Sequence, residues 1–123
     1  MEKLLAFHFN ETDLFKLRQL AAALKIRLEV VEPIDYKQTL ASLVSGKKNP
    51  LAEAFTGDVP EENLLLLCDY TEKRMDKLLL SLRKNQISVD YKAVLTSTNK
   101  QWNVLRLMLE MRMEKAAYEM RRN

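Results

Sequence analysis

The chain has 123 residues, of which 47% are hydrophobic and 30% charged, with only two glycines and three prolines. This length and composition exclude a disordered tail and indicate one helix-rich domain that buries its core without disulfides or a structural metal. The sequence contains no apolar run of about 18 residues and no signal peptide, so we expect a cytoplasmic protein outside the membrane. A single cysteine, Cys68, agrees with a reducing compartment.

The net charge is only +3, from 20 Lys and Arg against 17 Asp and Glu, and the two signs alternate along the chain. Proteins that bind nucleic acid usually concentrate their cations on one face. The charge pattern therefore predicts a mixed, solvated surface and does not favour a nucleic-acid partner.

The first half of the chain reads as strand, helix, strand, helix. Residues 4–9 are too short and apolar for a helix and predict a buried strand. A helix follows, capped by Asn10 or Thr12, and residues 26–31 predict a second strand. A second helix over residues 35–45 ends at a glycine.

The second half follows after a segment in which prolines and a glycine gather. Residues 47–62 contain these helix breakers together with enough apolar residues to pack on the body, so we expect a docked joint there. Residues 63–68 then predict a third strand, and Thr71 caps a third helix. Residues 89–95 predict a fourth strand, and residues 99–121 form one long helix without glycine or proline.

The two halves resemble copies of one unit, 61 residues apart. Leu4, Leu5, Glu11, Lys16, Leu17 and Ile26 recur as Leu65, Leu66, Glu72, Lys77, Leu78 and Ile87. Either the unit was duplicated, or two amphipathic units of a Leu-rich chain share these residues by composition. In both cases we expect a single α/β domain over residues 1–123, with halves at 1–46 and 63–123 and a docked joint at 47–62.

Strands separated by helices require crossover connections, which place neighbouring strands parallel. The pattern therefore predicts an α/β fold: a four-stranded, mainly parallel sheet built from two βαβα halves, with helices on both faces. The alternative is a ferredoxin-like α+β sheet, but that topology needs a direct hairpin and the sequence shows none.

The loops that follow parallel strands gather at one end of a sheet, where ligands bind in open α/β folds. Polar and aromatic residues in these loops are the candidates for ligand binding. They are Asn10, Asp69, Thr96, Thr98, Asn99 and Trp102.

The last helix is more apolar than one buried face requires. Eight of the twelve residues from Trp102 to Met113 are apolar, and four of the six methionines of the chain lie on this helix. Either the helix is sandwiched between the sheet and the joint, or its second face meets a partner, most simply a second copy of the chain. We favour a homo-oligomer, with an unknown protein as the other possible partner. The candidate interface residues are Leu105, Met108, Met111, Met113 and Met120.

Residues with catalytic chemistry are scarce. Only His8, Cys68 and Asp69 could support thiol chemistry, and a lone cysteine in a run of leucines is usually a small buried hydrophobe. No metal-ligand spacing and no glycine-rich phosphate loop is present. We therefore predict no catalytic residues, no metal and no cofactor, and we lean toward a protein that is not an enzyme.

One motif resembles a known family. The run Lys-Ala-Val-Leu-Thr-Ser-Thr-Asn at residues 92–99, followed by Trp102, is similar to the Lys-Ala-Val-Leu-Thr-Pro-Thr-Asn-x-x-Trp signature of the bacterial domain-of-unknown-function 3783 family. Ser97 stands where that signature has proline, and the resemblance covers residues 63–118. It implies no established activity and no catalytic residues.

Two functional hypotheses follow from the sequence. The first is an uncharacterised cytosolic domain that acts through protein association, as a homodimer through the C-terminal helix. The second is a small-molecule binding or sensing domain with its pocket at the strand ends.

Overall fold

The computed structural model describes residues 1–122, and the strands and helices alternate as the sequence pattern predicts. The strands are β1 (Lys3–Phe7), β2 (Arg27–Val31), β3 (Leu64–Cys68) and β4 (Tyr91–Val94). The α-helices are α1 (Glu11–Leu24), α2 (Leu40–Ser45), α3 (Glu72–Lys84) and α4 (Val104–Arg122). Short 3₁₀ turns at Pro33–Asp35 and Asn99–Gln101 precede α2 and α4. The fold is α/β, as expected.

The sheet has the order β2-β1-β3-β4, and the relative directions of its strands differ from the expectation. Strand β1 is parallel to β2 and β3 is parallel to β4, whereas β1 and β3 are antiparallel, with Lys3 opposite Cys68 and Phe7 opposite Leu64. The sheet is therefore mixed instead of mainly parallel. A crossover helix sets strand direction only inside each βαβ unit, so the longer path through α2 and residues 47–62 leaves the central pair free to run antiparallel.

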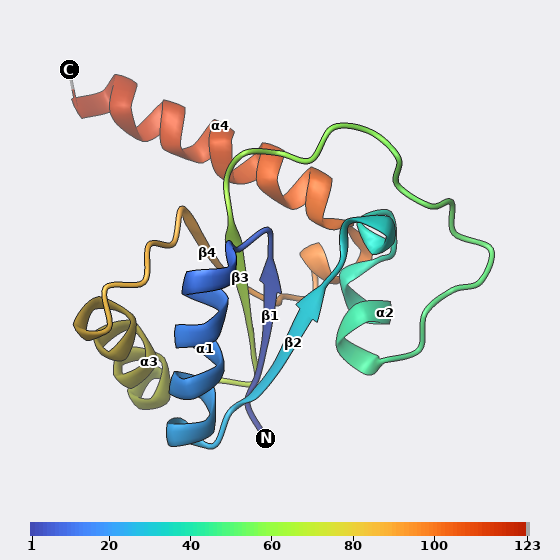
Figure 1. The fold of residues 1–123 in the computed structure, drawn as a ribbon. Helices are drawn as coiled ribbons and strands as arrows, with labels where there is room; N and C mark the ends of the chain where they lie inside the picture. Colours follow the sequence, from blue (N-terminus) through green and yellow to red (C-terminus); the bar gives the residue numbers. More distant parts are fainter. Residues whose placement is uncertain (123) are drawn as a thin grey trace.

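Helices cover both faces of the sheet (Figure 1). Helices α1 and α3 lie on one face, and α2 together with the first turns of α4 lies on the other. The two central strands are buried from both sides, so every residue after Lys3 in β1 and every residue of β3 is apolar instead of alternating with polar ones. Alternate leucines point to opposite layers: Leu65 packs with Leu17 and Leu78, whereas Leu66 packs with Leu40 and Leu107.

The two halves share backbone conformations as well as sequence. His8 and Asp69, which follow β1 and β3, have φ angles of 65° and 64°. Lys25 and Gln86, at the ends of the first helix of each half, have φ angles of 57° and 56°. Each pair of left-handed residues is separated by the same 61 positions as the sequence repeat. The same strand-to-helix turn and the same helix ending are thus built twice.

The segment 47–62 is held to the first half by specific contacts. The buried amide of Gln38 donates from Nε2 to the Asn49 carbonyl oxygen at 2.9 Å and accepts the Asn49 N–H at 2.8 Å. Phe55 stacks on the buried ring of Tyr36, with 5.8 Å between ring centroids. Gln38 therefore pairs with this segment as a neighbouring strand would.

No helix within residues 1–122 is long and apolar enough to cross a membrane.

We predict that Gln38→Ala lowers the free energy of unfolding by about 1–3 kcal/mol, because it leaves the N–H and C=O of Asn49 without their partner. Urea unfolding measures this change, and limited proteolysis should show faster cleavage within residues 47–62. Gln19→Ala is the matched control, since Gln19 is exposed on α1 and its loss should change stability by less than about 0.5 kcal/mol. Equal effects of the two substitutions would contradict the role given to Gln38.

Candidate functional site

The antiparallel central pair separates the candidate ligand-binding residues that a parallel sheet would gather. Asn10 follows β1 and lies at the end of the sheet where β3 begins; its side-chain oxygen accepts the Asp13 N–H at 2.7 Å and caps α1. Asp69 follows β3 at the opposite end, where it lines a shallow cavity with Lys3 and Arg27. The four remaining candidates, Thr96, Thr98, Asn99 and Trp102, lie together in the loop between β4 and α4.

This loop is closed by reciprocal hydrogen bonds between Thr96 and Asn99. The Thr96 N–H donates to Asn99 Oδ1 at 2.8 Å, and the Asn99 N–H donates to Thr96 Oγ1 at 3.0 Å. The carbonyl oxygen of Trp102 then accepts the N–H of Leu40, the first residue of α2, at 2.8 Å. The loop thus also supplies an acceptor for one of the free N–H groups at the start of α2.

Asn99 also protects the open edge of the sheet. Tyr91 donates its N–H to the carbonyl oxygen of the residue just before β3, and Leu95 donates its N–H to β3, so the backbone groups of Val94 point to the free side of β4. The buried Asn99 side chain donates from Nδ2 to that Val94 carbonyl oxygen at 2.9 Å. An open strand edge is a template for unwanted pairing, and Asn99 blocks the last residue of this one.

A cavity of about 400 Å³ lies between β4 and α4, and the loop forms one of its walls. Its lining includes all four loop candidates, together with Lys92 from β4 and Glu110 and Glu114 from α4. The Arg106 guanidinium covers the Trp102 ring at 4.4 Å from its centroid, a cation–π contact that holds the indole in place. The cavity therefore combines an aromatic wall with charges of both signs.

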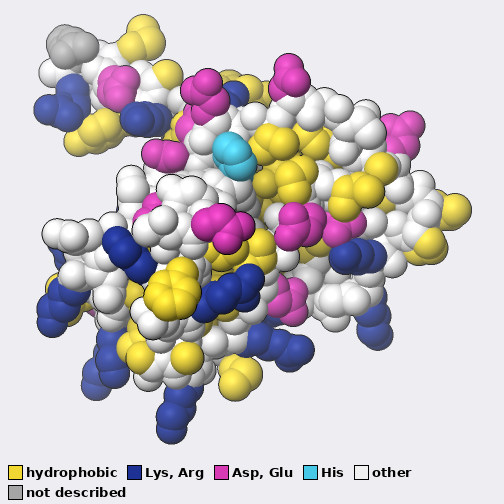
Figure 2. Space-filling view, viewed as in Figure 1, with side chains coloured by type: hydrophobic (Ala, Val, Ile, Leu, Met, Phe, Trp, Pro, Cys, Tyr) yellow, Lys and Arg dark blue, Asp and Glu magenta, His cyan; other side chains and the backbone are white. Residues whose placement is uncertain are grey.

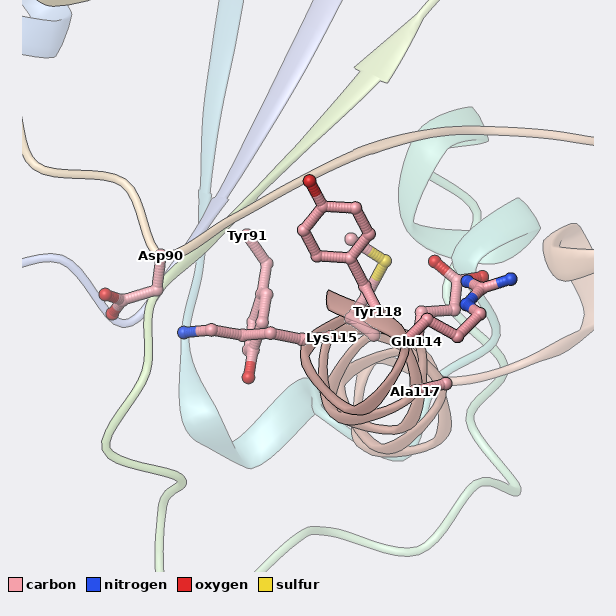
Figure 3. A pocket seen from close by; sticks show the side chains of 8 residues that line it. Asp90, Tyr91, Glu114, Lys115, Ala117 and Tyr118 are labelled. Carbon is pink, nitrogen blue, oxygen red and sulfur yellow. The ribbon is translucent and has the colours of Figure 1, made fainter. Parts of the chain in front are cut away.

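A second cavity, of about 570 Å³, continues from the first along α4 (Figure 3). Met111 and Glu114 line both cavities. Figure 3 shows Lys115 extending from the helix toward Tyr91, the first residue of β4, and Asp90, which precedes it, while Tyr118 extends from the helix beside Lys115. We call the two cavities together the α4 groove.

An ion pair fixes α4 over this groove. Arg112 donates from Nε to Oε2 of Glu62 at 2.7 Å, and the Tyr91 hydroxyl donates to the same oxygen at 3.2 Å. The hydrogen bond from Arg112 holds the pKa of the Glu62 carboxyl at about 2, well below its usual value. Glu62 therefore stays ionised at neutral pH and links the end of the joint to α4 and β4.

Helix α4 is buried only along its first turns. Val104, Leu107 and Met108 belong to the core, and Met108 is only 1% exposed. Leu105 and Met111 are partly buried against the same core. The structure thus removes Met108 from the candidate interface, because its side chain already fills the space between helix and sheet.

Residues 112–122 of α4 are all exposed, and we call this part the overhang. Its C-terminal end projects from the body in Figure 1, and Figure 2 shows hydrophobic, basic and acidic side chains mixed on it. Met113 is 57% exposed and Met120 is 78% exposed, so these two interface candidates remain free to contact a partner.

An apolar row runs along the outer face of α4. Met113 follows Val104 by nine positions, or two and a half turns, so it lies opposite the buried face. The row consists of Leu109, Met113, Ala116 and Met120, and each of these residues is exposed. Their spacing of four, three and four is that of a coiled-coil seam. Sequence reasoning missed Leu109 and Ala116, although this heptad spacing was visible in the sequence.

Cys68 and His8 do not form a reactive pair. Cys68 lies opposite Lys3, whereas His8 lies at the other end of β1, with Nδ1 3.4 Å from the Glu62 carbonyl oxygen. Burial raises the pKa of the Cys68 thiol to about 11, so the thiol is protonated at neutral pH. In the described part of the chain no group of three or more His, Cys, Asp and Glu side chains could hold a metal ion.

The family model described as domain of unknown function (DUF3783) matches residues 63–118. This part of the chain belongs to the DUF3783 family. The match confirms the resemblance carried by residues 92–99 and Trp102. No curated protein and no solved structure matches the chain.

The DUF3783 segment extends from the start of β3 to the overhang of α4. It therefore contains both the loop closed by Asn99 and most of the residues that line the α4 groove. Of the polar residues in the motif, Thr96 and Asn99 are used in closing the loop, whereas Thr98 is exposed.

We predict that Asn99→Ala lowers the free energy of unfolding by about 2 kcal/mol, because the Thr96 N–H and the Val94 carbonyl lose their partner. Thr98→Ala, one residue away and exposed, should change it by less than about 0.5 kcal/mol. Urea unfolding of both variants checks this difference. If Asn99→Ala left the free energy of unfolding unchanged, the loop would close without the side-chain amide of Asn99, and the role given to Asn99 would be wrong.

Proposed function

We propose that the protein works without catalysis, as an association domain that forms a homodimer through α4. The observation that carries this proposal is the apolar row of Leu109, Met113, Ala116 and Met120 on the outer face of the helix. The row is exposed and has the spacing that fits a second helix.

The overhang supports the same proposal, because a helical segment of this length gains little stability by itself. Isolated helices shorter than about 12–15 residues are marginal in water, and most helical stability in proteins comes from packing of an apolar face. Residues 112–122 have no buried side chain of their own. A partner helix on the row would supply the missing packing.

The size of the row sets the expected strength of the dimer. Four apolar residues span about three helical turns, which is small beside the interfaces of permanent complexes. We therefore expect a dissociation constant in roughly the micromolar range, so that oligomeric state depends on protein concentration.

We predict that Met113→Glu combined with Met120→Glu converts the protein to a monomer of 14.4 kDa while the fold is retained, because both side chains are exposed. Native mass spectrometry and light scattering across a concentration series measure the mass, and circular dichroism measures the fold. Phe15→Glu combined with Leu80→Glu is the matched control, with exposed apolar residues replaced on α1 and α3. A wild-type monomer at every concentration, or dissociation of the control as well, would contradict the proposal.

A second function, small-molecule binding in the α4 groove, is favoured by a separate observation. The cavity of about 400 Å³ is large enough for a small ligand, and seven residues of the family motif line it. The groove lies on the body side of α4, whereas the apolar row lies on the outer side. Binding in the groove and pairing through the row can therefore occur in the same protein.

The binding hypothesis predicts that some member of a metabolite panel raises the melting temperature of the wild-type protein. Lys92→Ala combined with Thr98→Ala should abolish the increase, because both exposed residues line the cavity and neither closes the loop. Lys73→Ala on α3 is the control and should retain the ligand-dependent increase in melting temperature. The hypothesis fails if no compound raises the melting temperature and native mass spectra of freshly purified protein show no added mass.

A further inference from the structure

Resting on the proposed homodimer, we infer that the two α4 helices pair in antiparallel orientation, with Leu109 of each copy facing Met120 of the other. The inference follows from the positions of apolar and charged residues on the outer face of the helix.

The antiparallel register covers the whole apolar row. When Leu109 faces Met120, the spacing along the helix makes Met113 face Ala116, so all four row residues of both copies meet an apolar partner. A shift by one heptad would instead place Leu109 against Met113 and bring Ala116 against Arg106. Only the unshifted register keeps every residue of the row in contact with an apolar side chain.

The flanking charges complement one another in this register. Arg112 and Glu119 lie on the same side of the row, one heptad apart. In the antiparallel pair, Arg112 of each copy lies beside Glu119 of the other, and the symmetry produces this contact twice. Glu62 accepts hydrogen bonds from Nε and Nη2 of the Arg112 guanidinium. Because the guanidinium has five N–H donors in all, Arg112 can bind the Glu119 carboxylate of the other copy as well as Glu62.

A parallel pair would have the opposite electrostatics. Arg106 continues the heptad spacing of the row toward the start of α4, so in register it would face Arg106 of the second copy. In a parallel pair, Arg112 would lie at the same height as Arg112 of the other copy, and Glu119 at the same height as Glu119 of the other copy. Parallel pairing would also align the two helix dipoles, whereas antiparallel pairing opposes them.

The position of the overhang agrees with this orientation. The 11 exposed residues 112–122 extend about 16 Å beyond the packed part of α4. In the antiparallel pair, residues 118–122 of each overhang lie along residues 107–111 of the other α4, and the two globular bodies lie at opposite ends.

Two single-cysteine variants test the orientation: Leu109→Cys and Met120→Cys, each at an exposed position of the full chain. We expect an equal mixture to form a disulfide-linked dimer under mild oxidation, whereas each variant alone does not. In the antiparallel register two copies of residue 109 are 11 positions apart along the axis, or about 16 Å, beyond the reach of a disulfide. Non-reducing electrophoresis and mass spectrometry of the products record the result.

Two controls test whether disulfide linking depends on the positions in the apolar row. The wild-type protein should give no linked dimer, because Cys68 is buried. Lys115→Cys places a thiol on the groove side of α4 and should not link with either variant.

The possible outcomes distinguish the inference from the proposal on which it rests. Linking of each variant with itself would show a parallel pair and overturn the inference, while the homodimer would stand. A dimeric mass without linking in the mixture would also overturn the inference. A monomer at every concentration would overturn the homodimer and the inference together.

A charge reversal provides an independent measurement. Glu119→Lys should weaken the dimer by roughly three- to tenfold at low salt, because it places a cation beside Arg112 of the second copy. Glu114→Lys, on the groove side, should leave the dissociation constant unchanged. No change on Glu119→Lys would overturn the antiparallel pairing.

Discussion

The antiparallel pairing of β1 with β3 is the interaction on which the rest of the structure depends. It joins two βαβα halves, each of which contributes only two strands and would be marginal alone. Both strands are buried on both faces, so the pairing also forms the centre of the two hydrophobic layers. Because the strands run in opposite directions, the strand ends of the first half lie away from those of the second. A single ligand site shared by all four strand ends is therefore impossible in this fold.

The DUF3783 motif has a structural explanation in this arrangement. β4 is an edge strand, and Asn99 donates to the last carbonyl group on its free side while it closes the loop with Thr96. Trp102 then accepts a hydrogen bond from the start of α2 in the other half. The motif thus ends the sheet, directs the chain into α4 and connects the two halves, which requires no catalytic chemistry.

Helix α4 presents two surfaces with different properties. The body side forms the groove, which is lined by charged residues, Trp102 and Tyr118. Within residues 104–122, the outer side carries the apolar row and the charges beside it. The ion pair between Arg112 and Glu62 holds the helix in the position that exposes both surfaces. The proposed association and the proposed ligand binding are therefore separable by mutation, since no residue of the row lines the groove.

The sequence by itself determined the alternation of strands and helices, the two similar halves, the family and the excess apolarity of the last helix. These features follow from local patterns: strand and helix periodicity, caps such as Asn10 and Thr71, and the motif at residues 92–99. Only the tertiary structure decided that β1 and β3 are antiparallel, because no crossover constrains strands joined through a long connection. That direction separated Asn10 from the loop at Thr96, and Cys68 from His8. Packing also decided that Met108 is core while Met113 is exposed, since hydrophobicity alone does not tell which apolar face of α4 lies against the sheet.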